Sequence, residues 1–232
     1  LDKDDNDDRL VGGQVGKTSY DWVQGPTGAG TFIECKKEGI RRGILFRYAG
    51  SDVDVYRCPA DQRKLVPGQI AFRSYSIAGG ANGEPWWNTY DQVEKYSQIL
   101  QPATKYIFVE ESDPRGWNKG SWVVDPLNKT WVDPLAIWHS RARSSLAFAD
   151  GHAEYWRWKG RETLTIPRIL SPMGDLFIEV IDYDILSEVA LPHGRRDYGY
   201  HVQTEDGLHD LRRVQRATWG RLGYADGDEE RP

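Results

Sequence analysis

The sequence predicts a fold that combines β-strands with short α-helices, and three stretches carry this prediction. Residues 146–158 contain an Asp150-Gly151 pair between alternating residues, which is the strongest short-range signal for a β-hairpin. Residues 105–111 form an apolar run that is typical of a buried strand. Residues 206–219 place apolar side chains at helical spacing along one side, which indicates an amphipathic helix.

The hairpin has a predicted register, because Asp and Gly both tolerate the positive φ of a two-residue type I′ loop. With Asp150-Gly151 as this loop, one apolar face should cover the core and carry two facing pairs, Phe148 with Ala153 and Leu146 with Tyr155. The opposite face should be mixed and should carry Ala147, Ala149, His152, Glu154, Trp156 and Trp158. Two tryptophans on that face would need a partner surface.

The remaining elements follow from local patterns of apolar residues, glycine and proline. Residues 11–34 are glycine-rich and predict an ordered loop, whereas residues 40–48 have helical spacing with Gly50 as the C-cap. The other predicted elements are an extended segment at 53–61, a strand at 73–80, a helical turn at 96–100, a loop at 114–138 and one or two strands within 177–191.

Two histidines near the hairpin loop allow two interpretations. His139 and His152 could join Asp150 in a metal or acid/base site. Alternatively, Asp150, Gly151 and His152 serve turn chemistry and His139 is a packed, hydrogen-bonded side chain. We favour the structural interpretation, because such spacings often match by chance. The chain also lacks a phosphate-binding loop, a Gly-x-Ser-x-Gly elbow and a His-Glu-x-x-His motif, so the sequence does not predict an enzyme.

Composition limits the classes of partner. The 232 residues carry a net charge of -5 with a pI near 5.6, so there is no basic footprint for nucleic acid. The mean hydropathy is -0.66, and no apolar run approaches the length of a membrane span. Ten tryptophans are spread along the chain, and they fit either an aromatic core or an association surface. The candidates for an exposed interface are four tryptophans in predicted loops: Trp86, Trp87, Trp117 and Trp122.

The two cysteines, Cys35 and Cys58, also leave two possibilities. In an exported protein they would form a disulfide that stabilises the fold by roughly 3 kcal/mol. Otherwise they are two reduced, buried thiols.

An acidic strand end is the best sequence candidate for chemistry. Glu110 and Glu111 are adjacent in a strand and point to opposite faces, so they cannot form a carboxylate dyad. Glu111 and Asp113 could share one face and bind a hard cation such as calcium, the one cofactor the sequence suggests. The alternative is a loop that caps itself and forms a salt bridge with Arg115.

Four segments together resemble a bacterial family. They are Asp-Asn-Asp-Asp-Arg-Leu at 5–10, Tyr-Arg-Cys-Pro-Ala-Asp at 56–61, Arg-Ser-Tyr-Ser at 73–76, and the run from Ser144 through Phe-Ala-Asp-Gly-His to Trp158. In this order they resemble prepilin-type, type II secretion pseudopilin-like proteins, whose C-terminal signature is His, nine residues, Asp-Gly. Here ten residues separate His139 from Asp150.

The resemblance implies an α+β fold, with a pilin-like antiparallel sheet and short helices at 1–159. Residues 160–232 would be a C-terminal extension packed on the same domain, with extra strands, a helix and an acidic tail at 225–232. A long N-terminal helix, absent from this chain, would begin as a membrane span and later line a filament core. The acidic start at Leu1 fits the segment that follows such a helix.

The implied function is structural. The chain would be an exported, surface or extracellular subunit of a filament, pseudopilus or tube related to type IV pili, built as a helical polymer. Its partners would be further copies of itself and the secretion or pilus assembly machinery, with membrane contact only through the long helix. The alternative is a secreted module that binds carbohydrate or another substrate through exposed tryptophans.

Overall fold

A four-stranded antiparallel sheet forms the centre of the molecule. The computed structural model describes residues 6–28, 33–61, 63, 71–84, 92–113, 120–126, 128–165 and 200–218. The strand order is β3-β4-β6-β7, with β3 at Tyr75–Ile77, β4 at Tyr106–Glu110, β6 at Arg143–Phe148 and β7 at Ala153–Arg157. The predicted mixture of helices with an antiparallel sheet is therefore confirmed.

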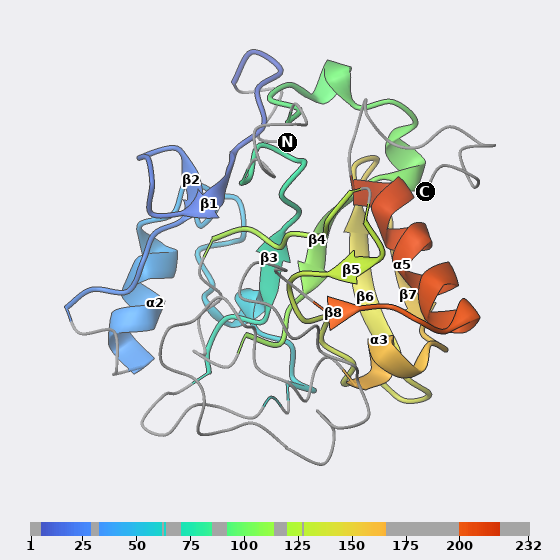
Figure 1. Cartoon of the computed structure of the whole chain (residues 1–232). Coiled ribbons are helices and arrows are strands. Elements are labelled where there is room, and N and C mark those ends of the chain that lie inside the picture. Colours follow the sequence, from blue (N-terminus) through green and yellow to red (C-terminus); the bar gives the residue numbers. More distant parts are fainter. Residues whose placement is uncertain are drawn as a thin grey trace.

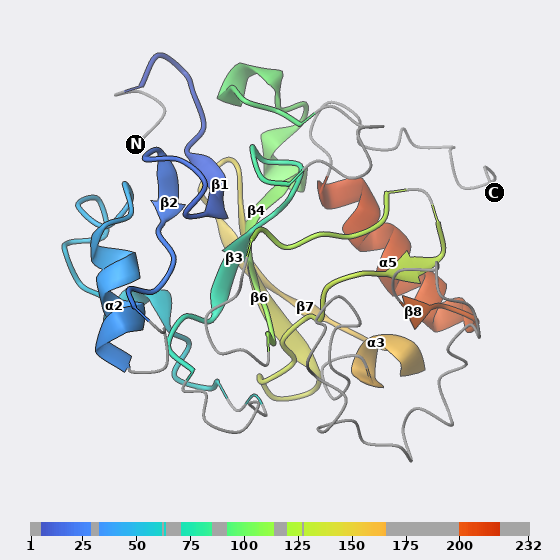
Figure 2. The ribbon, with the colours of Figure 1, turned by 60° about the vertical axis from the view of Figure 1, so that its left-hand side comes forward.

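Helices and small strand pairs cover this sheet from two sides (Figures 1 and 2). On one side lie α2 (Ile33–Arg41) and the parallel pair of β1 (Gly12–Val15) with β2 (Asp21–Val23). On the other side lie α5 (Glu205–Thr218) and α3 (Arg161–Thr165).

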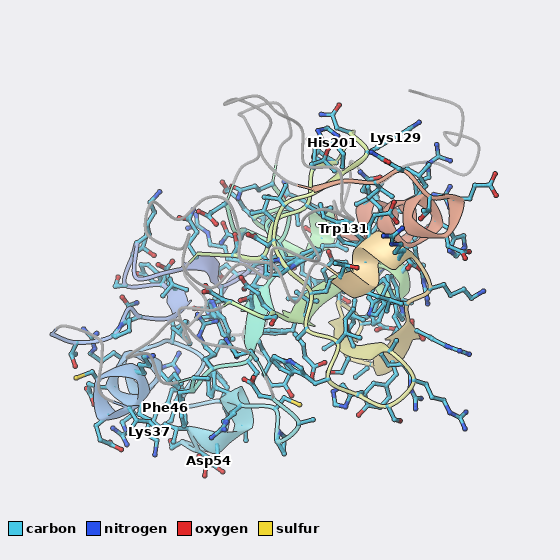
Figure 3. The ribbon with its side chains drawn as sticks, turned by 60° about the horizontal axis from the view of Figure 1, so that its bottom comes forward. Lys37, Phe46, Asp54, Lys129, Trp131 and His201 are labelled. Atoms are coloured by element: carbon cyan, nitrogen blue, oxygen red, sulfur yellow. The ribbon has the colours of Figure 1, made fainter. Side chains whose placement is uncertain are left out.

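Several short elements complete the described parts of the chain. The antiparallel pair of β5 (Thr130–Trp131) and β8 (Tyr200–His201) lies near α5. In Figure 3, Lys37 and Phe46 on the α2 side lie at the opposite end of the molecule from Trp131 and His201. Three 3-10 turns are η1 (Asp54–Tyr56), η2 (Tyr96–Gln98) and η3 (Pro102–Thr104).

Tryptophans form the core between the sheet and α5. Trp122, Trp131, Trp156 and Trp158 are all nearly inaccessible, and their rings meet edge to face at centroid distances of 5.9–6.4 Å. Leu211 and Val214 of α5 close this cluster. The predicted amphipathic helix is therefore confirmed both in its position and in the side that it buries. Among the described tryptophans only Trp138 is partly exposed, so the aromatic-core interpretation applies to the others.

The hairpin is present, but its loop is one residue longer than predicted. Phe148 accepts a hydrogen bond from the Gly151 amide at 3.0 Å and donates its own amide to the His152 carbonyl at 2.8 Å. Gly151 has φ +98, whereas Asp150 does not adopt a positive φ. The loop is therefore Ala149-Asp150-Gly151 with a left-handed glycine, and the predicted two-residue type I′ loop is wrong.

This extra residue moves every side chain of β7 to the other face. Leu146 pairs with Glu154 instead of Tyr155, since a one-residue slip reverses the faces of a strand. Trp156 consequently lies in the core, and Tyr155 is 56% exposed. Leu146 and Phe148 keep their predicted core positions.

A bulge in β4 turns Ile107 and Val109 towards different layers. Tyr106 pairs with Phe148, but Phe108 pairs with Ala147, so Ile107 is an extra residue in the ladder. As a result Val109 belongs to the tryptophan core, whereas Ile107 packs with the α2 layer.

The α2 layer has its own apolar core, centred on Trp22, Ile40 and Phe72. Its helix ends at Arg41, and residues 42–51 form consecutive turns, so the helix predicted at 40–48 is wrong in its bounds. The chain then passes close to β2 at Gly43, where a Cβ would lie 2.1 Å from the Trp22 carbonyl oxygen. The loop predicted at 11–34 contains β1, β2 and the start of α2 instead.

The strand at 73–80 and the turn at 96–100 are confirmed in shorter form, as β3 and η2. The strands predicted within 177–191 and the acidic tail at 225–232 lie outside the described residues. Among the helices that the structure describes, none combines the length and the apolar character that a membrane crossing requires.

Candidate functional site

Three side chains from separate parts of the chain converge at the end of the central sheet. His139 Nε2 lies 2.9 Å from Glu110 Oε1 and 3.7 Å from Cys58 Sγ. All three polar atoms lie within 4.8 Å of one another. Glu110 is fully buried, Cys58 is 2% exposed, and the His139 side chain is 20% exposed. We call Cys58, Glu110 and His139 the CEH cluster.

The sheet register places Glu110 in this cluster. Glu110 ends β4 between Tyr75 of β3 and Ser145 of β6, and its Oε2 accepts the Ser145 amide at 2.8 Å. His139 immediately precedes β6 and pairs with Arg143 across a tight turn. Its ring packs edge-on against Tyr155 of β7 at 4.8 Å. The cluster therefore rests on the ends of three neighbouring strands.

A buried ion pair holds the third member in place. Cys58 is followed by Asp61, whose carboxylate binds the Arg63 guanidinium at 2.6 Å with both side chains inaccessible. Asp61 also accepts the Ser74 hydroxyl at 2.7 Å, and Arg63 donates to the carbonyls of Arg73 and Asp113. These bonds anchor the segment that carries Cys58 against the residues that directly precede β3.

Burial dominates the electrostatics around the thiol. It raises the pKa of Cys58 to about 11, and the nearby Glu110 carboxylate adds to this shift. Burial likewise raises the pKa of the adjacent Tyr75 hydroxyl well above its ordinary value. A thiol with a raised pKa is a poor nucleophile at neutral pH, because the reactive species is the thiolate.

The arrangement of the polar atoms also differs from that of a catalytic triad. In a triad the two imidazole nitrogens separate, one binding the nucleophile and the other the carboxylate. Here a single nitrogen, His139 Nε2, contacts both Cys58 and Glu110. The three donor atoms therefore form a compact group rather than a relay.

No family model, curated protein or solved structure matches this chain. Its function therefore has to be inferred from its own residues and their arrangement. The resemblance carried by the four sequence segments stays a prediction.

The cation site at Glu111 and Asp113 stays a prediction. Both residues are buried, and Glu111 accepts the Ser76 hydroxyl on the sheet face opposite Glu110. Among the described residues, only the CEH cluster brings three potential ligand atoms of Cys, His, Asp or Glu close together. Neither Glu111 nor Asp113 belongs to it. The prediction that Glu110 and Glu111 point to opposite faces is confirmed.

The residues of the hairpin loop do not join His139. Asp150 Oδ1 binds His152 Nδ1 at 2.6 Å at the exposed tip, and this hydrogen bond lowers the pKa of Asp150. His139 pairs at the other end of the six-residue strand β6, on the order of 20 Å away at the usual rise per residue. The structural interpretation of Asp150, Gly151 and His152 therefore fits the geometry.

The predicted disulfide is wrong in this structure, because Cys35 and Cys58 are both free. Cys35 is a half-buried residue of α2, whereas Cys58 points to His139 on the sheet. The alternative of two reduced thiols describes the structure.

Trp122 is not an exposed interface residue. Its backbone pairs with Ile77 and Gly79 along β3, and its indole is inaccessible between Tyr106 and Trp131. The other three predicted interface residues, Trp86, Trp87 and Trp117, lie outside the described residues.

An apolar groove of about 300 Å³ opens beside the CEH cluster, on the same face of the sheet. The sheet contributes Tyr75 and Phe108, and the turns after α2 contribute Leu45, Tyr48 and Ala49. Trp22, Val55 and Tyr56 complete the lining. The buried Trp22 Nε1 and Tyr56 hydroxyl have no hydrogen-bond partner in the structure.

The CEH cluster has no local signature in the sequence, because its members lie 29 to 81 residues apart. Cys58 lies in one of the segments that carry the family resemblance, and His139 stands one residue further from the Asp-Gly pair than the histidine of the family signature.

Proposed function

We propose that this protein is a structural subunit of an extracellular or envelope-associated filament, pseudopilus or tube. One face of its central sheet supports this proposal. Over β3 and β4 the face is covered by the α2 layer, through Ile77 and Phe108. Over β6 and β7 the same face carries Ala153 and the 56% exposed Tyr155, and it has no covering layer among the described residues.

A half-covered sheet face is unusual for an isolated domain, since sheets bury their apolar face against another layer. The apolar groove lies on this same face, and Val55 at its edge is 53% exposed. The uncovered β6–β7 surface also carries Arg143 and Arg157, and exposed apolar side chains with polar residues around them mark association sites. We call the groove and the uncovered β6–β7 surface the open face.

The open face fits the pilin-like architecture that the sequence resembles. In that architecture the sheet packs on a long apolar helix, and repeated contacts between copies generate an open helical polymer. Further copies of the chain and the secretion or pilus assembly machinery are the partners that follow from this proposal. Export to the cell surface or beyond would be part of the same function.

The groove also favours a second candidate function, a secreted binding module. The walls of the groove include the aromatic rings of Tyr48, Tyr56 and Tyr75. These rings could hold a ligand in the way that the sequence predicts for exposed tryptophans. Its lining is otherwise apolar, so an apolar helix or peptide fits it better than a sugar, which needs several polar partners.

Assembly of the full-length protein tests the proposal. Val55→Asp and Tyr155→Asp each place a charge on the open face, and both should abolish filaments in negative-stain microscopy and pelleting assays. Leu100→Asp is the matched control, because Leu100 is 57% exposed but does not line the groove. Normal assembly of both open-face variants would overturn the proposal, and retained binding of a peptide or glycan probe would then support the binding module.

A further inference from the structure

We propose that the CEH cluster binds a divalent transition metal ion, with Zn²⁺ as the best match. Cys58 supplies a thiolate sulfur, His139 an imidazole nitrogen and Glu110 a carboxylate oxygen. This proposal does not rest on filament formation, although the cluster adjoins the open face through the contact of His139 with Tyr155.

Two of the separations between donor atoms can be compared with those around a tetrahedral ion. With zinc–ligand distances of roughly 2.0–2.3 Å, neighbouring ligand atoms lie about 3.4–3.6 Å apart. The observed separation of Cys58 Sγ from His139 Nε2 is 3.7 Å. The 2.9 Å between His139 and Glu110 is a hydrogen-bond distance, and it has to open by about half an ångström to admit the ion.

The chemistry of the donors selects the class of metal. A mixed sulfur, nitrogen and oxygen set favours zinc and its neighbours over calcium and magnesium, which prefer all-oxygen sites. The thiolate and the carboxylate together balance the charge of a divalent ion. Three protein ligands also leave one coordination position for water or another small ligand.

The surroundings provide both rigidity and access. Glu110 Oε2 is held by the Ser145 amide, and Cys58 is held through the Asp61–Arg63 pair, so both ligands are fixed before an ion arrives. His139 alone has exposed surface, and an ion would therefore enter from its side. Once bound, the ion would link three segments that are far apart in the sequence.

Titration of the metal-free protein with Co²⁺ is the most direct test. Coordination by Cys58 should produce a sulfur-to-cobalt charge-transfer band and the intense visible bands of a four-coordinate ion, at one equivalent. Addition of Zn²⁺ should bleach both. Zn²⁺ should also raise the Tm in proportion to the logarithm of its concentration, because it binds the folded state preferentially.

The two cysteines supply a matched pair of variants. Cys58→Ser should remove the charge-transfer band and weaken zinc binding by roughly 100-fold or more, since loss of outer-shell partners alone costs 10–100-fold. Cys35→Ser should bind like the parent, because Cys35 lies in α2 and outside the cluster. Equal binding by both variants, or no charge-transfer band in the parent, would overturn the proposal.

X-ray absorption of the zinc-loaded parent protein keeps the test independent of how well the variants fold. The expected first shell contains one sulfur near 2.3 Å and lighter atoms near 2.0–2.1 Å. A shell without sulfur, or with two sulfurs, would contradict the site.

Discussion

His139 and Glu110 are joined by a hydrogen bond of 2.9 Å, formed between the segment before β6 and the end of β4. The other oxygen of the same carboxylate accepts the Ser145 amide. One fully buried side chain therefore connects β4, β6 and a histidine 29 residues further along the chain.

Replacement of Glu110 by leucine should lower the free energy of unfolding by about 2–3 kcal/mol. The variant leaves the Ser145 amide without its acceptor, and hydrogen bonds to charged groups contribute more than neutral ones. Urea denaturation of metal-free protein measures the loss. Glu34→Leu in α2 is the control, because its side chain is 66% exposed and should change stability by less than about 0.5 kcal/mol.

Adjacent residues of β7 should respond in opposite ways to truncation. Trp156 is 4% exposed in the tryptophan core, so Trp156→Ala should cost about 3–5 kcal/mol. Tyr155→Ala should leave the monomer nearly as stable as the parent, because the ring is mostly in solvent. Thermal unfolding of both variants tests the observed register directly. The reverse order of stabilities would restore the two-residue loop.

Gly151→Val should destabilise the hairpin by about 1–3 kcal/mol, because a β-branched residue is strained at φ +98. No atom lies within 4 Å of a Cβ built at this position, so the cost would come from the backbone alone. Gly151→Asn is the informative comparison, since asparagine tolerates positive φ and should lose much less. Equal melting temperatures for the Val and Asn variants would contradict this explanation.

Removal of one partner of the buried Asp61–Arg63 ion pair should strongly lower the free energy of unfolding. Arg63→Met leaves the Asp61 carboxylate buried without its partner, and we expect a loss of about 3–5 kcal/mol. The double variant Asp61→Asn with Arg63→Met removes both charges and should recover part of that loss. A double-mutant cycle by chemical denaturation measures the coupling. Additive losses would show that the pair is not coupled.

Glu162 should make stability depend on pH in the acidic range. Desolvation alone would raise its pKa, but hydrogen bonds from Thr204 and from the amides of Gln203 and Thr204 outweigh it and lower the pKa. A carboxylate with a lowered folded-state pKa stabilises the fold above its unfolded pKa, and this contribution is lost as pH falls through the folded value.

The matched variant is Glu162→Gln, which should be less stable than the parent at pH 7 by about 1–2 kcal/mol. The difference should shrink below about pH 4, where the parent carboxylate takes up a proton. Melting curves from pH 7 to pH 3 check both points. A difference that stays constant with pH would show that the charge of Glu162 does not matter.

Local signals in the sequence were enough for several elements. The apolar spacing of residues 206–219 predicted α5 and its buried side, because an amphipathic helix shows its period within a few turns. The alternation and the Asp-Gly pair located the hairpin for the same reason. The mixture of antiparallel strands with short helices followed from these local patterns.

Tertiary structure decided which side chains face the core wherever one extra residue shifts the register of a strand. The third loop residue at Ala149 and the bulge at Ile107 each reversed which side chains reach the core, and neither changes the local apolar pattern. Trp122 is buried because its backbone pairs with a segment distant in the sequence, whereas Trp156 is buried because the hairpin register shifts by one residue. The CEH cluster arose in the same way, because Cys58, Glu110 and His139 become neighbours only when the ends of β3, β4 and β6 align.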